Sequence, residues 1–545
     1  MEDRVDKLRG LMAGAMRAAA VGMLLGCLWT ARCARGAAAE SGSVGQGMSA
    51  ADMATVDQAA LGPLAQTVDV TTLGPTHELI ENYFAATTRA DRDTITQQLV
   101  ASGVSPEVIG RILRNRQGWA VMRPGVYYID EQQQATTVRY FLGVPAGYKR
   151  TTSWPLVVKL PEAAAFLTNP WQTGDQVKNV YAQWIADELK AHPDALVLMP
   201  LLNLDELYGP GYTGMNLAMQ PIFHAAGIVN IDPARVDLIG HSMSAHAVWN
   251  LGVHYTTYFA AINPMAGAMD EIWQKIRLPN LSNVLPVVWA DSTDKIVNAD
   301  ESRKIVNMLK SNNVPVMYHE TSDSGHVPPA ALVEMMYKEI RAATRPLYPG
   351  KVTIQSDRPD TRFNRLDWVQ VWDQVNTGKI TTMKFTHGLG QMTECQNDYR
   401  LDATIDAANH VTVKTDKNVA ALRLYFNDQM VDMSKPVTVV VDGKPQFSGM
   451  LTADIDKMLK DQLFLGRGWR YFTAALEVDI DFPDAPPMPV TTGSGDKSGD
   501  ATAPINPTSR PRGHIEFINP DGSEKDYVPG QGAPAKNPPD DLNEQ

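Results

Sequence analysis

The stretch Arg235-Val236-Asp237-Leu238-Ile239-Gly240-His241-Ser242-Met243-Ser244 predicts both a fold and a reactive serine. Its apolar first half indicates a strand, and a helical pattern follows from Ser244 to Tyr255. A serine on a tight strand-to-helix turn needs small residues two positions before and two positions after it, and Gly240 and Ser244 are small. Glycine is usual at the second of these positions, so Ser244 is a departure. We therefore predict a nucleophile elbow with Ser242 as the nucleophile.

The pattern on either side of this turn predicts an α/β fold. Short apolar runs, typical of strands buried on both faces of a parallel sheet, recur at residues 155–160, 195–200, 235–240, 259–264 and 286–290. Further strand signals lie at residues 126–129, 137–141 and 314–319, and helical patterns lie at 176–191, 215–228, 244–255 and 301–311. This alternation predicts a doubly wound, mostly parallel sheet, whose ligands bind beyond the carboxyl ends of the strands.

The chain has 545 residues, which is too long for one ordinary domain, and its pattern changes along its length. We predict a signal peptide at 1–39, a flexible lead-in at 40–75, a helical segment at 76–120, the α/β domain at 121–346, a β-sandwich-like module at 350–482 and a disordered Pro/Gly-rich tail at 486–545. The module is predicted from alternating segments such as 410–414 and from the hairpin signal Asp442-Gly443. The tail lacks the apolar periodicity that could offset its ordering entropy.

The first 39 residues resemble an export signal. Basic residues precede an apolar stretch from Ala18 to Trp29, and the small residues Ala37-Ala38-Ala39 follow as a cleavage site. An uncleaved membrane anchor is one alternative, and a lipoprotein box that leaves Cys27 lipidated is another. We expect a secreted or periplasmic bacterial protein with no stable membrane span after processing.

The composition limits the classes of partner and cofactor. The formal net charge of -12 argues against a nucleic-acid partner, because phosphate binding needs clustered Lys and Arg. Of the three cysteines, only Cys395 would remain after cleavage at residue 39, so we expect no internal disulfide. The sequence shows no Cys/His cluster with zinc spacing, and we expect no metal and no cofactor.

A serine hydroxyl attacks a carbonyl carbon only when a base removes its proton. In the elbow arrangement the acid and then the base follow the serine along the chain. His326 stands in Ser324-Gly325-His326-Val327-Pro328, a tight loop after the last predicted strand of the sheet. We predict His326 as the base, in preference to the other candidates His241, His246, His254 and His319.

The acid that orients the imidazole is expected in Asp291-Ser292-Thr293-Asp294-Lys295-Ile296-Val297, directly after the strand at 286–290. Either aspartate could serve. Asp294 lies further into the loop, which favours it, whereas Asp291 could be a turn or cap residue.

Residues 138–332 resemble the α/β-hydrolase superfamily. They are most similar to bacterial extracytoplasmic esterases related to polyhydroxybutyrate depolymerases, feruloyl esterases and prolyl-oligopeptidase-like hydrolases. The matches occur in the family's order: the elbow at 240–244, a segment like FAAIAPVAG at 259–267, an acid loop like H-G-x-x-D-x-x-V-P at 290–298, and Gly-His at 325–326. The resemblance places the acid at Asp294.

The resemblance implies hydrolysis of a small-molecule or polymeric carboxylic ester through an acyl-enzyme on Ser242. Two alternatives remain open. One is a peptidase of the prolyl-oligopeptidase-like type, and the other is a non-catalytic binding protein on a hydrolase scaffold. The β module receives no assignment from the resemblance.

The loop after the first parallel strand departs from the family, in which it is H-G-G-G-like and donates an N–H to the oxyanion. Here it reads Leu160-Pro161-Glu162-Ala163-Ala164-Ala165. Since Pro161 has no N–H, we predict Glu162 or Ala163 as one donor. We predict Met243, the residue after the nucleophile, as the other.

Aromatic side chains could bind a substrate ring or sugar. Trp171 and Tyr212 fall near the predicted strand ends and are candidates for lining a substrate pocket. In the β module, core packing is the commoner use of aromatic side chains, and a carbohydrate platform is the alternative, formed by Trp368, Trp372, Trp469 and Tyr471.

Overall fold

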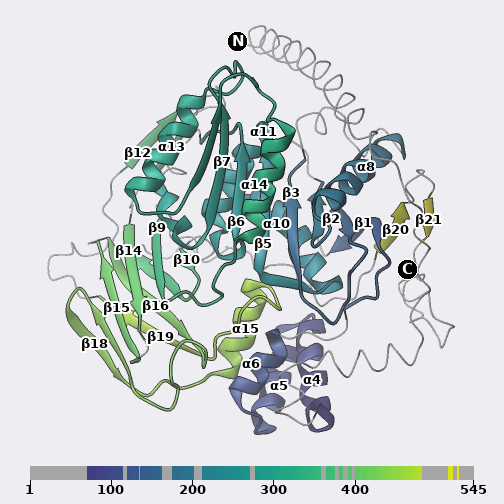
Figure 1. Ribbon diagram of the computed structural model, residues 1–545. Helices are drawn as coiled ribbons and strands as arrows, with labels where there is room; N and C mark the ends of the chain where they lie inside the picture. The colour runs from purple at the N-terminus through teal and green to yellow at the C-terminus, as the bar shows by residue number, and fades with distance from the viewer. Residues whose placement is uncertain are drawn as a thin grey trace. The chain divides into compact units, whose positions relative to one another are not determined.

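The computed structural model describes residues 70–114, 119–133, 136–161, 175–201, 212–269, 276–356, 364–374, 380–384, 391–395, 399–406, 408–416, 418–480, 513–518 and 524–526 (Figure 1). All of them belong to one compact unit, which spans Ala54–Gln545. The predicted signal peptide, Cys27 and residues 40–69 of the predicted lead-in lie outside the described residues.

A mixed sheet lies at the centre of this unit (Figure 1). Its main strands are β1 (Gly125–Gln133), β2 (Thr136–Val144), β3 (Trp154–Lys159), β4 (Leu196–Pro200), β5 (Ile231–His241), β6 (Ala261–Met265), β7 (Leu285–Asp291) and β8 (Met317–Thr321). They are ordered β1-β2-β4-β3-β5-β6-β7-β8. The strands from β4 to β8 in this order run parallel, whereas β1 and β2 are antiparallel to their neighbours.

Helices cover both faces of the sheet. Three pack on one face, α10 (Tyr212–Ile228), α11 (Met243–His254) and α13 (Ala299–Ser311), and two on the other, α8 (Asp175–Ala191) and α14 (Ala330–Ala342). The side chains of β7 alternate between the two cores, because Val288 faces α13 whereas Val287 and Trp289 face α14. The predicted α/β class with a doubly wound, mostly parallel sheet is confirmed.

Two strands in the region that the sequence predicts to be disordered extend this sheet. They are β20 (Gly513–Ile518) and β21 (Glu524–Asp526). β20 pairs antiparallel with β1, from Val126↔Ile518 to Glu131↔Gly513. The prediction is wrong for these two segments, because it rested on overall composition. A short segment can join a sheet wherever an edge strand offers unpaired backbone groups.

The N-terminal helices are α4 (Val70–Ala85), α5 (Arg89–Ala101) and α6 (Pro106–Arg114). α4 begins inside the predicted flexible lead-in. The three helices share an apolar core with α15 (Ile455–Leu465), to which Met458 and Leu459 contribute. The buried guanidinium of Arg467 donates to both carboxylate oxygens of Glu81, at 2.8 and 2.5 Å. The N-terminal helices and the segment around α15, which are far apart in the sequence, are therefore packed together.

The C-terminal module contains two sheets that enclose one apolar core. One sheet has β9 (Lys351–Ser356), β14 (Tyr399–Ile405), β15 (His410–Thr415), β17 (Val437–Val441) and β18 (Lys444–Gly449). The other has β10 (Arg365–Leu366), β11 (Val369–Gln374), β16 (Val419–Phe426) and β19 (Ala474–Asp479), and a separate hairpin has β12 (Ile380–Lys384) and β13 (Gln391–Cys395). Asp442 and Gly443, with φ of 49° and 80°, turn the chain from β17 into β18, as the hairpin signal predicts.

The alternative of a carbohydrate platform in this module is not supported. Trp368, Trp469 and Tyr471 are buried, so their rings pack within the protein. Trp372 is exposed, but the guanidinium of Arg423 lies 3.5 Å from the centre of its ring. The aromatic residues thus do not form a shared flat surface.

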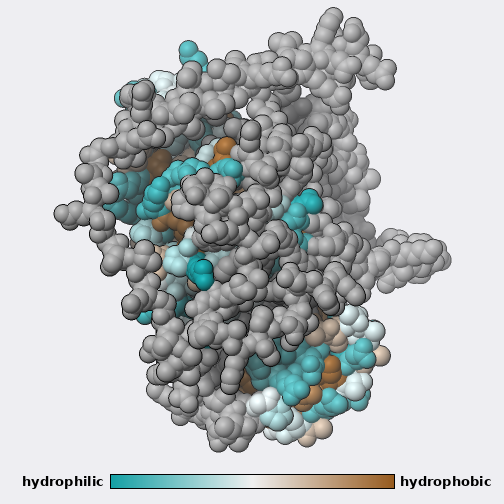
Figure 2. Space-filling view, turned by 90° about the vertical axis from the view of Figure 1, so that its right-hand side faces the viewer, coloured by the Kyte–Doolittle hydropathy of each residue, from teal (hydrophilic) through white to brown (hydrophobic). Residues whose placement is uncertain are grey.

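Where Figure 2 colours residues by hydropathy, hydrophobic and hydrophilic ones lie next to one another in small groups. The exposed large apolar residues come from separate elements, for example Val100 in α5, Trp372 in β11 and Met450 after β18. Among the described helices, none combines the length and the hydropathy that a membrane span requires.

The β module contacts the edge of the central sheet at which the parallel strands begin. β9 packs against the short helix η3 (Leu278–Asn283), which immediately precedes β7. Polar contacts also join the module to η2 (Thr256–Tyr258), which precedes β6. Parallel strands start at one edge and end at the other, so the module lies at the edge opposite the strand ends.

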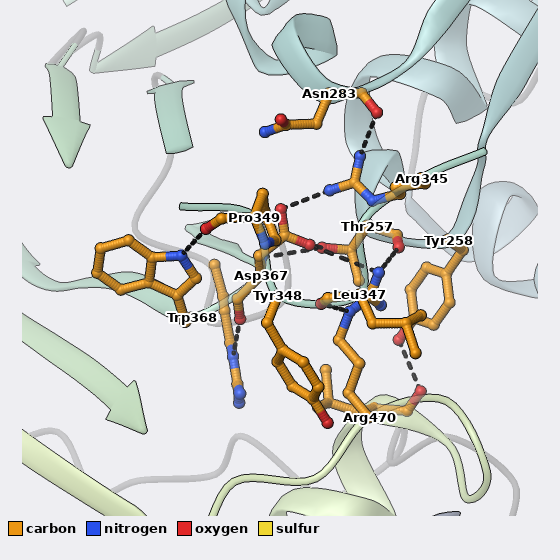
Figure 3. Close-up of polar contacts among 12 residues, drawn as sticks. Thr257, Tyr258, Asn283, Arg345, Leu347, Tyr348, Pro349, Asp367, Trp368 and Arg470 are labelled. Atoms are coloured by element: carbon orange, nitrogen blue, oxygen red, sulfur yellow. Dashed lines mark hydrogen bonds and ion pairs between the residues drawn. The ribbon is translucent and has the colours of Figure 1, made fainter. Parts of the chain in front are cut away.

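A buried polar network forms this junction (Figure 3). We call Thr257, Arg345, Asp367 and Arg470 the junction network. The Asp367 carboxylate lies 2.5 Å from Arg345 Nη2 and 3.6 Å from Arg470 Nη2, and no side chain of the three is more than 1% exposed. Asp367 N–H donates to Thr257 Oγ1, and Arg470 donates to the carbonyl oxygen of Thr257. Burial lowers the pKa of Arg470 to about 10, and the Asp367 carboxylate opposes this decrease.

We predict that Asp367→Asn lowers the free energy of unfolding by about 3–5 kcal/mol, because it leaves two buried guanidinium groups without their carboxylate. Asn tolerates the positive φ of 52° at this position, so the backbone is not a confounding factor. The measurement is equilibrium unfolding in urea. The control is Glu477→Gln, which removes an exposed ion pair with Arg423 and should cost less than about 1 kcal/mol. Equal losses in the two variants would contradict this role of Asp367.

Candidate active site

The three residues that the sequence predicts to act together lie at the same edge of the sheet. Ser242 directly follows β5, Asp294 lies three residues after the end of β7, and His326 follows β8. These strands are close neighbours in the order β5-β6-β7-β8, so their ends meet. This is the edge opposite the β module.

The serine stands on a constrained turn. Ser242 has φ 59° and ψ −122°, a backbone conformation that residues with a side chain rarely adopt. Its N–H donates to the carbonyl oxygen of Met265 at 2.8 Å, which fixes the turn to the end of β6. A Cβ on Gly240 would lie 2.8 Å from the backbone carbon of Ser244, so the turn has no room for a side chain at that position.

Ser244, the departure from the usual glycine, has a structural role of its own. Its side chain is fully buried, and its hydroxyl donates a hydrogen bond to the carbonyl oxygen of Pro161. Pro161 begins the loop in which the sequence predicts an oxyanion donor. Ser244 therefore ties the elbow to the loop that follows β3.

Two hydrogen bonds join the three predicted residues into a chain. His326 Nε2 lies 2.7 Å from Ser242 Oγ, and His326 Nδ1 lies 2.7 Å from Asp294 Oδ2. With a neutral imidazole, Ser242 donates to Nε2 and the Nδ1–H donates to the carboxylate. The Asp294 side chain has 0% exposure and that of His326 has 9%, so both bonds are shielded from water.

The other oxygen of Asp294 is also bonded. Asp294 Oδ1 accepts the backbone N–H groups of Ile296 at 2.7 Å and Val297 at 3.1 Å. These bonds fix the carboxylate within its own loop and leave Oδ2 directed at the imidazole. Chemically, the arrangement can move a proton from the Ser242 hydroxyl to His326 while Asp294 stabilises the resulting imidazolium.

Asp291 does not contact the imidazole. It is fully buried, and its carboxylate accepts hydrogen bonds from the hydroxyl groups of Thr293 and Thr321 and from the backbone N–H groups of Thr293 and Ser324. Burial opposes ionisation, but these four bonds outweigh it and hold the pKa of Asp291 well below its usual range. Of the two aspartates in the predicted acid loop, Asp294 is the one whose carboxylate lies beside the His326 imidazole.

The competing histidines have other contacts. His254 Nδ1 lies 2.8 Å from the carbonyl oxygen of Asn250, and burial, with Arg277 nearby, lowers the pKa of His254 well below its usual value. His319 Nε2 lies 2.8 Å from a carboxylate oxygen of Glu339. His246 lies on α11.

His241 contacts the site in a way that the sequence did not indicate. Its Nε2 lies 2.7 Å from the carbonyl oxygen of His326, and since a carbonyl oxygen only accepts, this nitrogen carries the proton. The bond connects the residue before the nucleophile to the backbone of the base. The signal in the sequence was only a polar residue at the end of a buried strand.

The remaining site predictions stay predictions. Met243 is the first residue of α11, where helix N–H groups favour negative charge. Glu162, Ala163 and Trp171 lie outside the described residues, as does the side chain of Tyr212. In the part of the chain that the structure describes, no group of three or more His, Cys, Asp or Glu residues could hold a metal ion.

The strand order together with the strand–turn–helix at Ser242 is that of the α/β-hydrolase fold. No known family and no curated protein matches the chain by sequence. Similar solved structures include a thermostable esterase, at 17% identity over 40% of this chain and 63% of that chain, with a TM-score of 0.31. The chain thus spans less than two thirds of that esterase.

Two further similar structures come from named organisms. One is a ferulic acid esterase from Anaeromyces mucronatus, with 14% identity over 42% of this chain and 93% of that chain and a TM-score of 0.31. The other is dipeptidyl peptidase 4 from Porphyromonas gingivalis, with 12% identity over 41% of this chain and 36% of that chain and a TM-score of 0.32.

We predict that Gly240→Ala destabilises the protein by about 1–3 kcal/mol, because the added methyl group would overlap the backbone of Ser244. The shift in the free energy of unfolding in urea measures this. Gly350→Ala is the matched control, since its methyl group would meet only the carbonyl oxygen of Ile405 at 3.5 Å, an ordinary contact. That variant should stay within about 1 kcal/mol of the wild type. A stable Gly240→Ala variant would show that the elbow is less tightly packed than the structure indicates.

Proposed function

We propose that this protein is an exported serine hydrolase that cleaves carboxylic esters through an acyl-enzyme on Ser242. The observation that supports this most directly is the pair of 2.7 Å hydrogen bonds from Ser242 to His326 to Asp294, at a turn that holds the serine in a strained conformation. A serine on its own is a weak nucleophile, and these contacts supply the base and the orienting acid that it needs.

In the proposed reaction, Ser242 Oγ attacks the ester carbonyl carbon while His326 Nε2 takes the hydroxyl proton. The tetrahedral intermediate collapses, and the alcohol leaves with the proton from His326. Water then gives a proton to His326 and attacks the acyl carbon. The second collapse releases the carboxylic acid and returns the proton to Ser242. Throughout, Asp294 holds the imidazole in the tautomer that these reaction steps require.

The oxyanion would accept hydrogen bonds from backbone N–H groups at the elbow and in the loop after β3. We propose Met243 for the first and Glu162 or Ala163 for the second. The bond from Ser244 to the Pro161 carbonyl supports this, since it holds the start of that loop beside the elbow. Trp171 and Tyr212 remain proposed pocket residues.

Export is part of the proposal and is supported by the sequence pattern of residues 1–39. The same geometry can cleave a peptide bond. The three residues therefore do not distinguish an esterase from a peptidase, and only the substrates that the protein cleaves can do so. Purified protein assayed with p-nitrophenyl esters of graded chain length, beside a panel of aminoacyl anilides, separates the two. We expect turnover of the esters. Turnover of the anilides alone would favour the peptidase.

We predict that Ser242→Ala abolishes ester cleavage and leaves urea unfolding unchanged, because the hydroxyl is the attacking group and only one atom is removed. The same variant should no longer be labelled by a fluorophosphonate probe. If the variant kept most of its activity, the nucleophile would have to lie elsewhere.

We predict that Asp294→Asn lowers kcat by about 10⁴-fold, because an amide in place of the carboxylate favours the wrong imidazole tautomer. Steady-state kinetics on a short-chain p-nitrophenyl ester measure the loss. A decrease below about tenfold would argue that Asp294 does not orient His326 during turnover.

A further inference from the structure

Asp291 is a second buried carboxylate beside the proposed catalytic residues, and the reaction as proposed does not use it. It is the last residue of β7, three residues before Asp294, and it is 0% exposed. We call residues 292–298 the acid loop and residues 322–329 the base loop. They follow β7 and β8, which are adjacent parallel strands.

The two oxygens of Asp291 divide their bonds between these loops. Oδ1 accepts the N–H of Thr293 at 2.7 Å and its hydroxyl at 2.5 Å, both from the acid loop. Oδ2 accepts the hydroxyl of Thr321, at the end of β8, at 2.6 Å, and the N–H of Ser324, in the base loop, at 2.9 Å. One side chain therefore fastens the loop that carries the acid to the loop that carries the base.

Four donors surround the Asp291 carboxylate, and an ionised carboxylate accepts from all four, whereas a protonated one would turn one of its oxygens into a donor. A buried charge without such bonds would be strongly unfavourable, so the bonds and the charge depend on each other. The direction of the hydrogen bond between Thr321 and Asp291 follows from a further contact. Thr321 Oγ1 accepts from Trp289 Nε1 at 3.2 Å, which leaves its own proton for Asp291.

The consequence for the site is geometric. Ser324 lies two residues before His326, and Asp291 lies three residues before Asp294, so movement at this contact would alter the distance from Nδ1 to Oδ2. Catalytic groups must be held within about 0.5 Å of their working geometry.

We propose that Asp291 is a positioning residue that sets the distance between His326 and Asp294 by bonding both of their loops. This inference rests on the proposed function. Asp291 acts through the two residues that it places and does not itself touch the reacting atoms.

The test is Asp291→Asn, with Asp323→Asn as the matched control, since Asp323 is an exposed residue of the same base loop. The asparagine NH2 group must face at least one donor, so some of the hydrogen bonds that join the acid loop to the base loop are lost. With each sample normalised by fluorophosphonate titration of active serines, we expect kcat to fall about 10- to 100-fold with little change in KM. Asp323→Asn should stay within about twofold.

Two readouts separate positioning from a loss of folded protein. The acid limb of the kcat/KM profile should move to lower pH in Asp291→Asn, because a displaced Asp294 stabilises the imidazolium less. Thr321→Val removes one donor from the same carboxylate, and its effect should not add to that of Asp291→Asn in the double variant. An unchanged kcat per active serine and an unchanged pH profile in Asp291→Asn would overturn the proposal.

A third readout does not depend on turnover. The His326 Nδ1–H that donates to a carboxylate should give a strongly downfield proton NMR signal, absent from Asp294→Asn. In Asp291→Asn we expect this signal to be shifted or broadened, and in Asp323→Asn to be unchanged. If the wild type cleaves no ester or anilide, the proposed function fails, and this signal still decides the positioning role. An unaltered signal in Asp291→Asn would reject it, as would a loss of kcat as large as the roughly 10⁴-fold loss expected for Asp294→Asn.

Discussion

The close approach of α11 to the end of β5 is the constraint on which the site depends. Because Gly240 has no side chain, the chain can reverse at Ser242 and direct the hydroxyl away from the sheet. The bonds of Ser244 to Pro161 and of His241 to His326 then fasten the neighbouring loops to this one turn. Reactivity and rigidity thus come from the same few residues, and a group held in a strained conformation is kept there by contacts on several sides.

Different parts of the protein lie at the two edges of the central sheet. The edge where the parallel strands end carries the hydrogen-bonded residues Ser242, His326 and Asp294. The edge where these strands begin contacts the β module. β7, with seven residues, spans about 20 Å between them at roughly 3.3 Å per residue. The module therefore contacts η3 and η2 at the edge opposite Ser242. Its junction is costly to separate, because Arg345 and Arg470 would lose the carboxylate that neutralises them in a buried setting.

The sequence predicts much of this arrangement, because the relevant signals are local. The buried strands, the elbow and the Gly-His pair at 325–326 are each encoded within a few neighbouring residues. The role of Asp291 was not predictable, because its partners Thr321 and Ser324 approach only once β7 and β8 pair. β20 was missed for the same reason, since its strand conformation depends on the edge of β1, and so was the helix α15, whose apolar face is matched by α5 and α6.

The contact between Arg467 and Glu81 joins residues that are 386 positions apart. A ribosome that adds about 5–20 residues per second needs roughly 20–80 s to produce the second partner after the first. During that interval α4 to α6 exist without α15, so the apolar core that they share lacks Met458 and Leu459. Completion of this core is therefore a late event in the life of a new chain, and a chain truncated before α15 carries exposed apolar helices that a chaperone or protease can recognise.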